Sequence, residues 1–291
     1  MVLVYVNPPA CRPSSGRLRC WGPSGPATEV PQDLGLVTAV VTQAYHTCVI
    51  TASKAVRCWG QDPWKSNVTV VPPNLGPAVA LALTSESACA LLESGLVRCW
   101  GTLRFGDVPS DMGAIKAIAG QWISFCALTA SGDARCWGGD NTLSATGPFI
   151  AAAPGANALC FLGASGAVAC QRALDNTPLD MSPVVALSVG DLHACALQAS
   201  GEVRCWGLDS VGIELVPVPP PDLGPCSAVY AGERHTCALN SLNTLRCWGA
   251  SEAITNVPTD LGSVLTVSIA TGQGPSVHVC VILQGELACC T

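Results

Sequence analysis

Short apolar stretches recur along this chain, separated by turns that contain proline and glycine. Residues 124–138, Ser-Phe-Cys-Ala-Leu-Thr-Ala-Ser-Gly-Asp-Ala-Arg-Cys-Trp-Gly, form a typical copy. The loop Ala130-Ser131-Gly132 predicts a hairpin of two short strands, because glycine suits the left-handed position of a three-residue loop. The apolar stretch 115–118 just upstream predicts one more strand. Each copy therefore predicts three antiparallel strands.

The hairpins repeat with a period near 40 residues. Cys-Trp-Gly occurs six times, and a second cysteine lies nine or ten residues upstream of each copy. Two weaker copies lie at Cys160 to Cys170 and at Cys280 to Cys289. The downstream cysteines are separated by 38, 41, 37, 34, 35, 42 and 42 residues. Such a period is typical of a solenoid, a propeller or another repeat array.

The predicted fold is all-β: a β-propeller of short antiparallel blades with one cross-strand disulfide hairpin per blade. Small sheets of this kind bury both faces when they stack radially, which also leaves only short edges. We expect a single domain over residues 1–291, with seven repeat units in 36–291 and seven blades. Residues 1–22 form either a partial N-terminal blade, which would make eight, or a closing hairpin. Segments 68–71 and 213–216 are candidates for a fourth, outer strand. Both ends look trimmed from something longer. The seven units begin near Leu36, Pro77, Gly113, Phe149, Pro183, Pro225 and Ser263.

The two cysteines of each hairpin are predicted to face each other. Directly opposed residues of an antiparallel pair lie within disulfide reach, whereas cysteines used only as small buried apolar residues would not need strict opposition. Glycine, or Asn243 and Lys54 in two copies, occupies the left-handed loop position. The predicted pairs are Cys11–Cys20, Cys48–Cys58, Cys89–Cys99, Cys126–Cys136, Cys160–Cys170, Cys195–Cys205, Cys237–Cys247 and Cys280–Cys289.

The first and last pairs need shorter, two-residue loops, Ser15-Gly16 and Gln284-Gly285. Cys226 and Cys290 are left over, and we hypothesise a bond between them.

Composition narrows the classes of function. The net charge is −6, which argues against the basic surface that binding to nucleic acid needs. No apolar run is long enough to insert in a membrane. No cysteine or histidine spacing indicates a metal site, no phosphate-binding loop or nucleophile motif occurs, and no cofactor is expected. We therefore expect a protein that is not an enzyme.

Several motifs resemble a known family. His-Thr-Cys-Ala-Leu at 235–239, with near copies at His46 and His193, is followed by a variant of Ser-Gly-x-Val-x-Cys-Trp-Gly. The pattern resembles the regulator of chromosome condensation repeat, in a superfamily that includes a propeller-shaped β-lactamase inhibitor protein. The cysteine-paired form is most similar to ectodomain repeats of crinkly-type plant receptor kinases and to secreted bacterial versions. The resemblance implies a propeller, but no residue maps onto the nucleotide-exchange activity of the family.

Residues that recur at the same position of several copies are expected to be structural. His46, His193, His235 and His278 all precede the first cysteine of a pair by two residues, which predicts a shared hydrogen-bonding position. An arginine before the second cysteine lies on the same strand face as the tryptophan, where it could stack on the indole; a ring of anion-binding arginines is the alternative. These arginines are Arg19, Arg57, Arg98, Arg135, Arg204 and Arg246.

Residues that differ between copies are the candidates for recognition. They lie in the segments after Trp-Gly, because variable loops on a rigid scaffold usually carry binding. The candidate partner-binding residues are Trp64, Phe105, Asp140, Asp209 and Ile213. The two aromatic residues are the expected anchors. Asn67-Val68-Thr69 is a lone glycosylation sequon.

The sequence thus favours a non-catalytic scaffold that binds an unidentified protein partner at the cell surface or outside the cell, and that could be an ectodomain fragment. No signal peptide is visible at residues 1–6. The alternative is a cytoplasmic regulator of a small GTPase, of the chromosome-condensation type. The cysteine register favours the first hypothesis and the missing leader favours the second.

Overall fold

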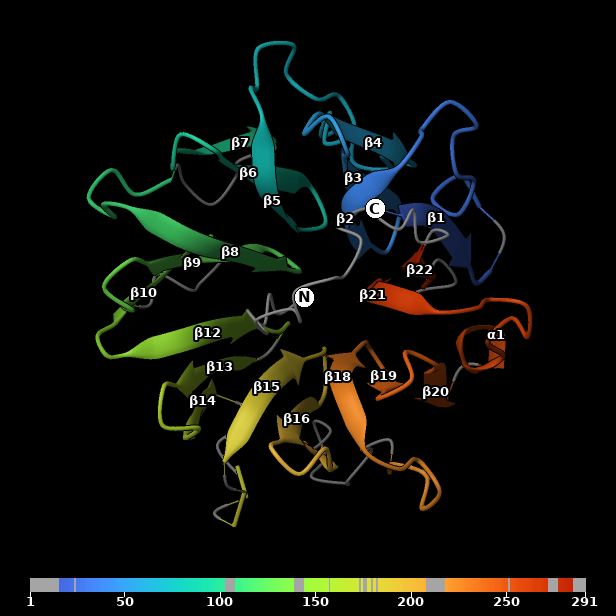
Figure 1. Ribbon diagram of the computed structural model, residues 1–291. Coiled ribbons are helices and arrows are strands. Elements are labelled where there is room, and N and C mark those ends of the chain that lie inside the picture. Colours follow the sequence, from blue (N-terminus) through green and yellow to red (C-terminus); the bar gives the residue numbers. More distant parts are fainter. Residues whose placement is uncertain are drawn as a thin grey trace, which may run out of the picture.

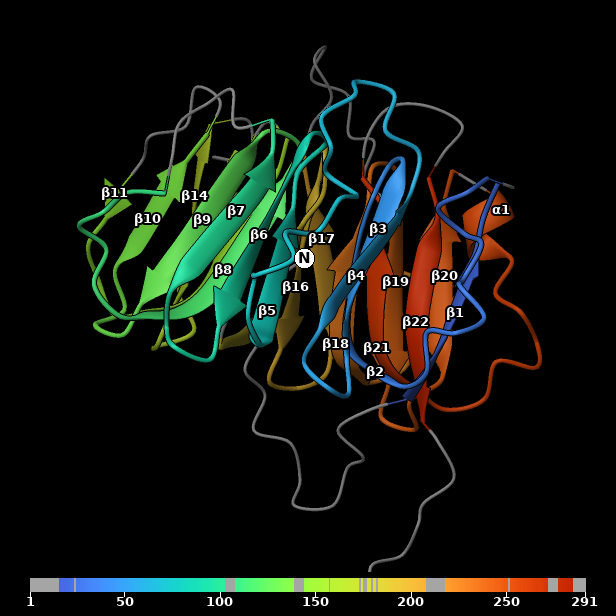
Figure 2. The same ribbon diagram turned by 90° about the horizontal axis from the view of Figure 1, so that it is seen from above.

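The strands of this protein surround a central axis (Figure 1). Figure 2 gives the side view, in which the strands run roughly along that axis. The computed structural model describes residues 16–23, 25–102, 108–138, 144–156, 158–172, 174, 177–178, 180–181, 183–207, 218–250, 252–271 and 277–284. The fold is a β-propeller built from three-stranded antiparallel units.

We name each unit after its first strand, which lies innermost in Figure 1. The first units along the chain are β2 (Val37–Gln43), β3 (His46–Thr51) and β4 (Val56–Gly60); β5 (Ala78–Leu83), β6 (Ser87–Leu92) and β7 (Val97–Gly101); and β8 (Ile115–Gln121), β9 (Ser124–Thr129) and β10 (Ala134–Trp137), extended by β11 (Ser144–Ala145). They are followed by β12 (Phe149–Pro154), β13 (Ala158–Gly163) and β14 (Val168–Arg172); β15 (Val184–Val189), β16 (Ala194–Gln198) and β17 (Val203–Trp206); and β18 (Cys226–Ala231), β19 (His235–Asn240) and β20 (Leu245–Gly249). The last unit combines β21 (Val264–Ile269) and β22 (Val279–Gln284) with the N-terminal strand β1 (Gly16–Trp21). A short helix, α1 (Glu252–Thr255), connects β20 to β21.

The hairpins between second and third strands have the predicted backbone. Gly95, Gly132 and Gly201 are left-handed, and so are the two residues that replace glycine, Lys54 at φ 65° and Asn243 at φ 58°. Since left-handed backbone is costly for lysine, the β3–β4 turn is formed despite a local penalty.

The glycine of Cys-Trp-Gly is required by close packing. Gly60 has φ 122°, and a Cβ atom there would lie 2.3 Å from the carbonyl oxygen of Tyr45. At Gly249 a Cβ atom would lie 2.4 Å from the carbonyl oxygen of Arg234. The third strand therefore leaves its unit across the turn that joins the first two strands, at a distance that only glycine allows.

Six disulfides join the second and third strands within their units, as the cross-strand register predicts. The bonded pairs are Cys48–Cys58, Cys89–Cys99, Cys126–Cys136, Cys160–Cys170, Cys195–Cys205 and Cys237–Cys247. In each pair the two residues are direct cross-strand partners with Cα atoms 4.0–4.1 Å apart.

The predicted pairs Cys11–Cys20 and Cys280–Cys289 are wrong. Cys20 is bonded to Cys280, across a sequence separation of 260 residues. The reason is that β1 runs antiparallel to β22 and supplies the third strand of the last unit, with Cys20 directly opposite Cys280. A cysteine from a second strand still pairs with one from a third strand, but the two strands come from opposite ends of the sequence. Cys11 and Cys289 lie outside the described residues.

Other local predictions also change. Gly16 does not lie in a hairpin loop: it begins β1 opposite Gln284, where a Cβ atom would lie 1.9 Å from the carbonyl oxygen of Leu283. Segment 68–71 turns instead of forming an outer strand, because left-handed Asn67 redirects the chain just before it. Cys226 is a buried thiol with no disulfide among the described residues, and Cys290, its hypothesised partner, lies outside them. Segment 213–216 lies outside the described residues.

The apolar core lies between neighbouring units. Ile50 of the β2 unit packs with Leu81 and Leu83 of the β5 unit. The same arrangement joins the last unit to the first, where Ile282 and Cys280 pack with Val49. Each unit therefore depends on its two neighbours for burial of its faces.

Removing the closing disulfide should cost more than removing any other. On the chain-entropy model, a crosslink over about 260 residues contributes up to about 5–6 kcal/mol, against about 3 kcal/mol for one over about ten residues. We expect the double variant Cys20→Ser, Cys280→Ser to lose correspondingly more unfolding free energy in urea than Cys89→Ser, Cys99→Ser. Equal losses for the two double variants would contradict the closing role.

Candidate functional site

The loop that follows β4 carries an exposed aromatic residue in an ordered setting. The Trp64 side chain is 42% exposed and packs edge-on against the Tyr45 ring, with centroids 5.1 Å apart and an interplanar angle of 81°. Tyr45 lies in the turn between β2 and β3, and its carbonyl accepts a hydrogen bond from the Gln61 amide at 2.7 Å. We call this end of the propeller, where the third strands end, the Trp-Gly face.

Asp62 organises the same loop. Its carboxylate accepts hydrogen bonds from the Ser66 amide (2.9 Å), the Ser66 hydroxyl (2.8 Å) and the Asn67 amide (2.6 Å). Partial burial raises the pKa of Asp62, but the hydrogen bonds from Ser66 and Asn67 outweigh it and hold the pKa below its ordinary value. The carboxylate thus fixes a turn in which Lys65 and Asn67 are both left-handed.

Two of the loops are tied to the propeller through a repeated tryptophan, whereas the indole nitrogens of Trp137 and Trp206 have no partner among the described residues. The Trp100 indole donates a hydrogen bond to the carbonyl of Val68 at 2.8 Å, and the Trp59 indole donates to the carbonyl of Ala27 at 3.2 Å. Each bond joins the tryptophan of one unit to the connection entering that unit. A main-chain acceptor sets no requirement on side chains, so these loops can vary in sequence while their anchor stays in place.

Of the predicted partner-binding residues, Trp64 is described, and it is exposed on an ordered turn. Phe105, Asp140, Asp209 and Ile213 lie outside the described residues. Sequence reasoning missed Tyr45. Its signal is an aromatic residue directly before His46, where the other histidine copies are preceded by Leu192, Arg234 and Val277.

The four histidines are structural residues at the contacts between units. All are buried, with at most 2% of their surface exposed. His278 Nε2 lies 2.9 Å from the Thr47 hydroxyl, which itself donates to the carbonyl of Ala27 at 3.0 Å, so the histidine is the donor. His193 Nε2 lies 2.8 Å from the Thr236 hydroxyl. In both cases the histidine of one unit meets the threonine that precedes the first cysteine of the next unit.

This pairing of a histidine with a threonine of the next unit also explains why two other histidines lack such a hydrogen bond. Among the described residues, neither ring nitrogen of His46 has a side-chain hydrogen-bond partner, and Nε2 of His235 has none. The position that holds threonine in the paired contacts holds Ala88 in the unit after His46 and Val279 in the unit after His235. Neither side chain offers a hydroxyl.

The repeated arginines form ion pairs at the turns that precede the first strands. Arg57 binds Asp33 at 2.9 Å, and Arg204 binds Asp180 at 2.7 Å, each 24 residues earlier. Hydrogen bonds from these arginines lower the pKa of both aspartates. Arg19, Arg135 and Arg246 pair in the same way with Asp260, Asp111 and Asp222. Arg98 instead donates to the carbonyl of Asn74 at 2.7 Å. Because five of the six arginines are paired with aspartates, the arrangement does not favour an anion-binding ring. Stacking on the indoles stays a prediction.

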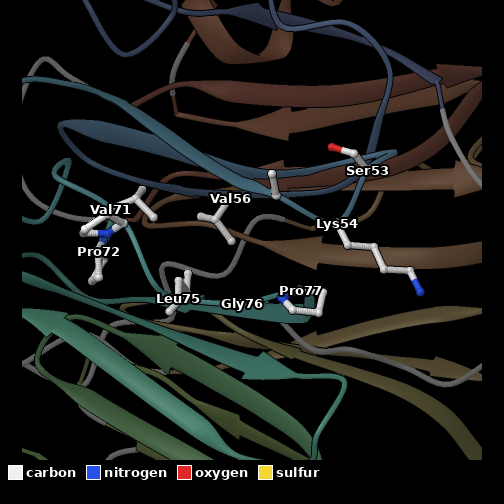
Figure 3. A pocket seen from close by; sticks show the side chains of 10 residues that line it. Ser53, Lys54, Val56, Val71, Pro72, Leu75, Gly76 and Pro77 are labelled. Atoms are coloured by element: carbon white, nitrogen blue, oxygen red, sulfur yellow. The ribbon is translucent and has the colours of Figure 1, made fainter.

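The opposite end, which we call the hairpin face, carries exposed aliphatic residues. Val79, Ile150 and Val185 are 49%, 43% and 40% exposed. Each is the extra residue of a register shift near the start of a first strand. The equivalent residue of the first unit is Thr38. A hollow of about 480 Å³ also opens here, between turn 53–56 and segment 71–77. Val56 and Leu75 line it, and Lys54 extends away from them (Figure 3).

Within the parts of the chain that the structure describes, no three histidine, cysteine or acidic side chains are arranged to hold a metal ion. The helix α1 is only four residues long, and none of the described residues form a helix long enough to span a membrane.

Comparison with known proteins agrees with this geometry. Residues 184–213 and 226–252 match the model of the regulator of chromosome condensation (RCC1) repeat. They include the β15 and β18 units. The protein is an RCC1-like β-propeller.

Solved structures of the same fold include cell-surface and other proteins. The ectodomain of the Physcomitrella patens receptor kinase CR4 has 22% identity and a TM-score of 0.66, over 83% of this chain and 71% of that one. The CRINKLY WD40 ectodomain of the Arabidopsis thaliana receptor kinase ACR4 has 20% identity and a TM-score of 0.66, over 84% and 94%. Prp20p of Saccharomyces cerevisiae has 16% identity and a TM-score of 0.74, over 94% and 92%. At these identities the likeness shows the fold alone. No curated protein sequence matches this chain significantly.

Two nearly isosteric substitutions at the histidine contacts should change the free energy of unfolding in opposite directions. Thr236→Val removes the partner of His193 and should cost about 1–3 kcal/mol, since a buried polar group is left unsatisfied. Val279→Thr offers His235 the missing hydroxyl and should be neutral or stabilise by up to about 1 kcal/mol. Urea unfolding of both variants checks the signs. A loss for Val279→Thr as large as that for Thr236→Val would contradict the pairing rule.

Stability should fall when the pH is lowered from about 6.5 towards 4. Burial lowers the pKa of His46, His193 and His235 to about 4, so the folded protein keeps them neutral while the unfolded chain takes up protons near pH 6.5. The unfolding free energy is then highest above pH 7. It falls by up to about 3 kcal/mol per histidine, because one pKa unit corresponds to about 1.4 kcal/mol.

Thermal melts across pH 4–7 check this dependence. His235→Gln removes one of the three contributing histidines and should make the profile less steep by about a third. A profile as steep as that of the wild type would show that His235 does not contribute to the dependence.

Proposed function

We propose that this protein is a non-catalytic, protein-binding propeller that acts outside the cytoplasm and recognises its partner through the loops of the Trp-Gly face. The observation that carries the proposal is the ordered loop around Asp62, which holds Trp64 exposed against Tyr45. Aromatic side chains that are held in place before binding lose little conformational freedom on binding, and they dominate interface energetics.

The disulfides support the extracytoplasmic location. Seven of them are formed among the described residues. Such density is typical of oxidising compartments. Two solved proteins of the same fold are ectodomains of plant receptor kinases.

We further propose that the propeller has seven blades, with β1 completing the last one. Strands β21, β22 and β1 pair as the strands of the other units do, and the β22–β1 pair carries the last disulfide. An eighth blade would need β1 to pair within its own hairpin.

The alternative is a cytoplasmic regulator of a small GTPase. Prp20p, a solved protein of the same fold, has binding properties towards Gsp1p and histones. Applied to this chain, that role predicts faster release of labelled GDP from a small GTPase. The disulfides argue against it, because they would not persist in a reducing cytoplasm.

Trp64→Ala should weaken partner binding without unfolding the protein. Loss of an aromatic anchor at the centre of an interface costs about 2 kcal/mol or more, roughly thirtyfold in Kd. Trp137→Ala, in contrast, should cost about 3–5 kcal/mol of stability, because Trp137 is 3% exposed in the core. The immobilised protein is used to capture a partner from extracellular fluid, and Kd and melting temperature are then measured for each variant.

Val79→Thr serves as the matched control on the hairpin face, since the first unit itself has Thr38 at this position. It should bind normally. If Val79→Thr abolishes binding while Trp64→Ala does not, the binding face is the opposite one. Acceleration of GDP release by the wild type would overturn the proposal in favour of the alternative.

A further inference from the structure

The loop that presents Trp64 also presents a glycosylation sequon, and its side chains alternate between core and solvent. Ser66 is 3% exposed and Val68 is fully buried, whereas Asn67 is exposed and Val70 is 64% exposed. Val68 is fixed by the bond from the Trp100 indole to its carbonyl. With both neighbours turned inwards, Asn67 must face outwards.

We propose that Asn67 is an N-linked glycosylation site. The inference rests on the extracytoplasmic location proposed above, because the modification requires passage through a secretory pathway. The main chain of Asn67 is engaged: its amide donates to Asp62, and its carbonyl accepts from the Val70 amide at 3.0 Å. Its side-chain amide makes no hydrogen bond within the described part of the chain, so it is available for modification.

The sequon is not explained by backbone requirements alone. Asparagine tolerates the left-handed conformation, and Asn67 has φ 61°. Lys65, two residues earlier, adopts φ 52° in the same turn without being asparagine or glycine. Nor does the backbone account for Thr69, a half-buried residue whose hydroxyl has no hydrogen-bond partner among the described residues. That hydroxyl is the second element of the acceptor motif.

The chemistry is a group transfer by a host enzyme from a lipid-diphosphate-linked oligosaccharide. The Asn67 side-chain nitrogen forms a bond to the anomeric carbon of the first sugar, and the bond from that carbon to the phosphate oxygen breaks. The lipid diphosphate leaves with the electron pair, and the amide nitrogen loses one proton. No oxidant or reductant is needed.

The test measures occupancy. The chain is secreted from a eukaryotic host behind a supplied signal sequence, and the intact mass is compared before and after a peptide N-glycosidase. Wild type and Thr69→Ser should lose a glycan mass and gain aspartate at position 67. Thr69→Val, which removes the hydroxyl, and Asn67→Gly, which keeps the left-handed backbone, should show no glycan. Wild-type protein that is secreted with Cys20 bonded to Cys280 but with Asn67 unmodified would overturn the proposal.

Partner binding is measured separately on unglycosylated Asn67→Gly, so failure of this inference and failure of the proposed function give different results.

Discussion

Pairing of β1 with β22 is the interaction on which the rest of the propeller depends. Each unit buries its faces only against its neighbours, so an open array would leave two exposed apolar faces. The N-terminal strand prevents this by completing the last unit, and Ile282 then packs beside Val49 of the first. The Cys20–Cys280 bond makes the closure covalent, and Arg19 extends the series of ion pairs across it through Asp260. The contacts at the junction are thus the same as those elsewhere in the ring.

In the closed ring, the side chains that hold the units together differ in kind from those that the variable loops expose. The scaffold uses side chains that recur: opposed cysteines, buried histidines, and arginines paired with aspartates. The loop before β5 is fixed partly through its backbone, by the bond from Trp100 to the carbonyl of Val68, and partly by the Asp62 carboxylate. Substitution of its other side chains leaves both anchors intact. The side chains around Trp64 are therefore free to be selected for binding or for modification.

Local regularities could be predicted from the sequence, whereas contacts between distant segments could not. The opposition of Cys126 and Cys136 depends on ten residues of chain, so strand register alone predicts it. The same reasoning paired Cys20 with the wrong partner, because β1 pairs across the whole sequence. The buried histidine positions were predictable from their repetition, but their threonine partners belong to the next unit. Trp64 stood out because no other copy shares it. Its contact with Tyr45 depends on how one turn lies over another, which no spacing rule describes.

The geometry of the closure also decides how the molecule bears mechanical load. Gly16 lies opposite Gln284 at the end of the β1–β22 pair and also opposite Val37 of β2, which joins the last and the first unit in one sheet. Tension applied at Gly16 and Gln284 separates the β1–β22 pair from this end, one residue pair at a time. Four residue pairs separate before the force reaches Cys20 and Cys280. There a covalent bond replaces the next pair of contacts. Tension applied at Gly16 and Gln284 would therefore open one end of one strand pair and leave the ring closed.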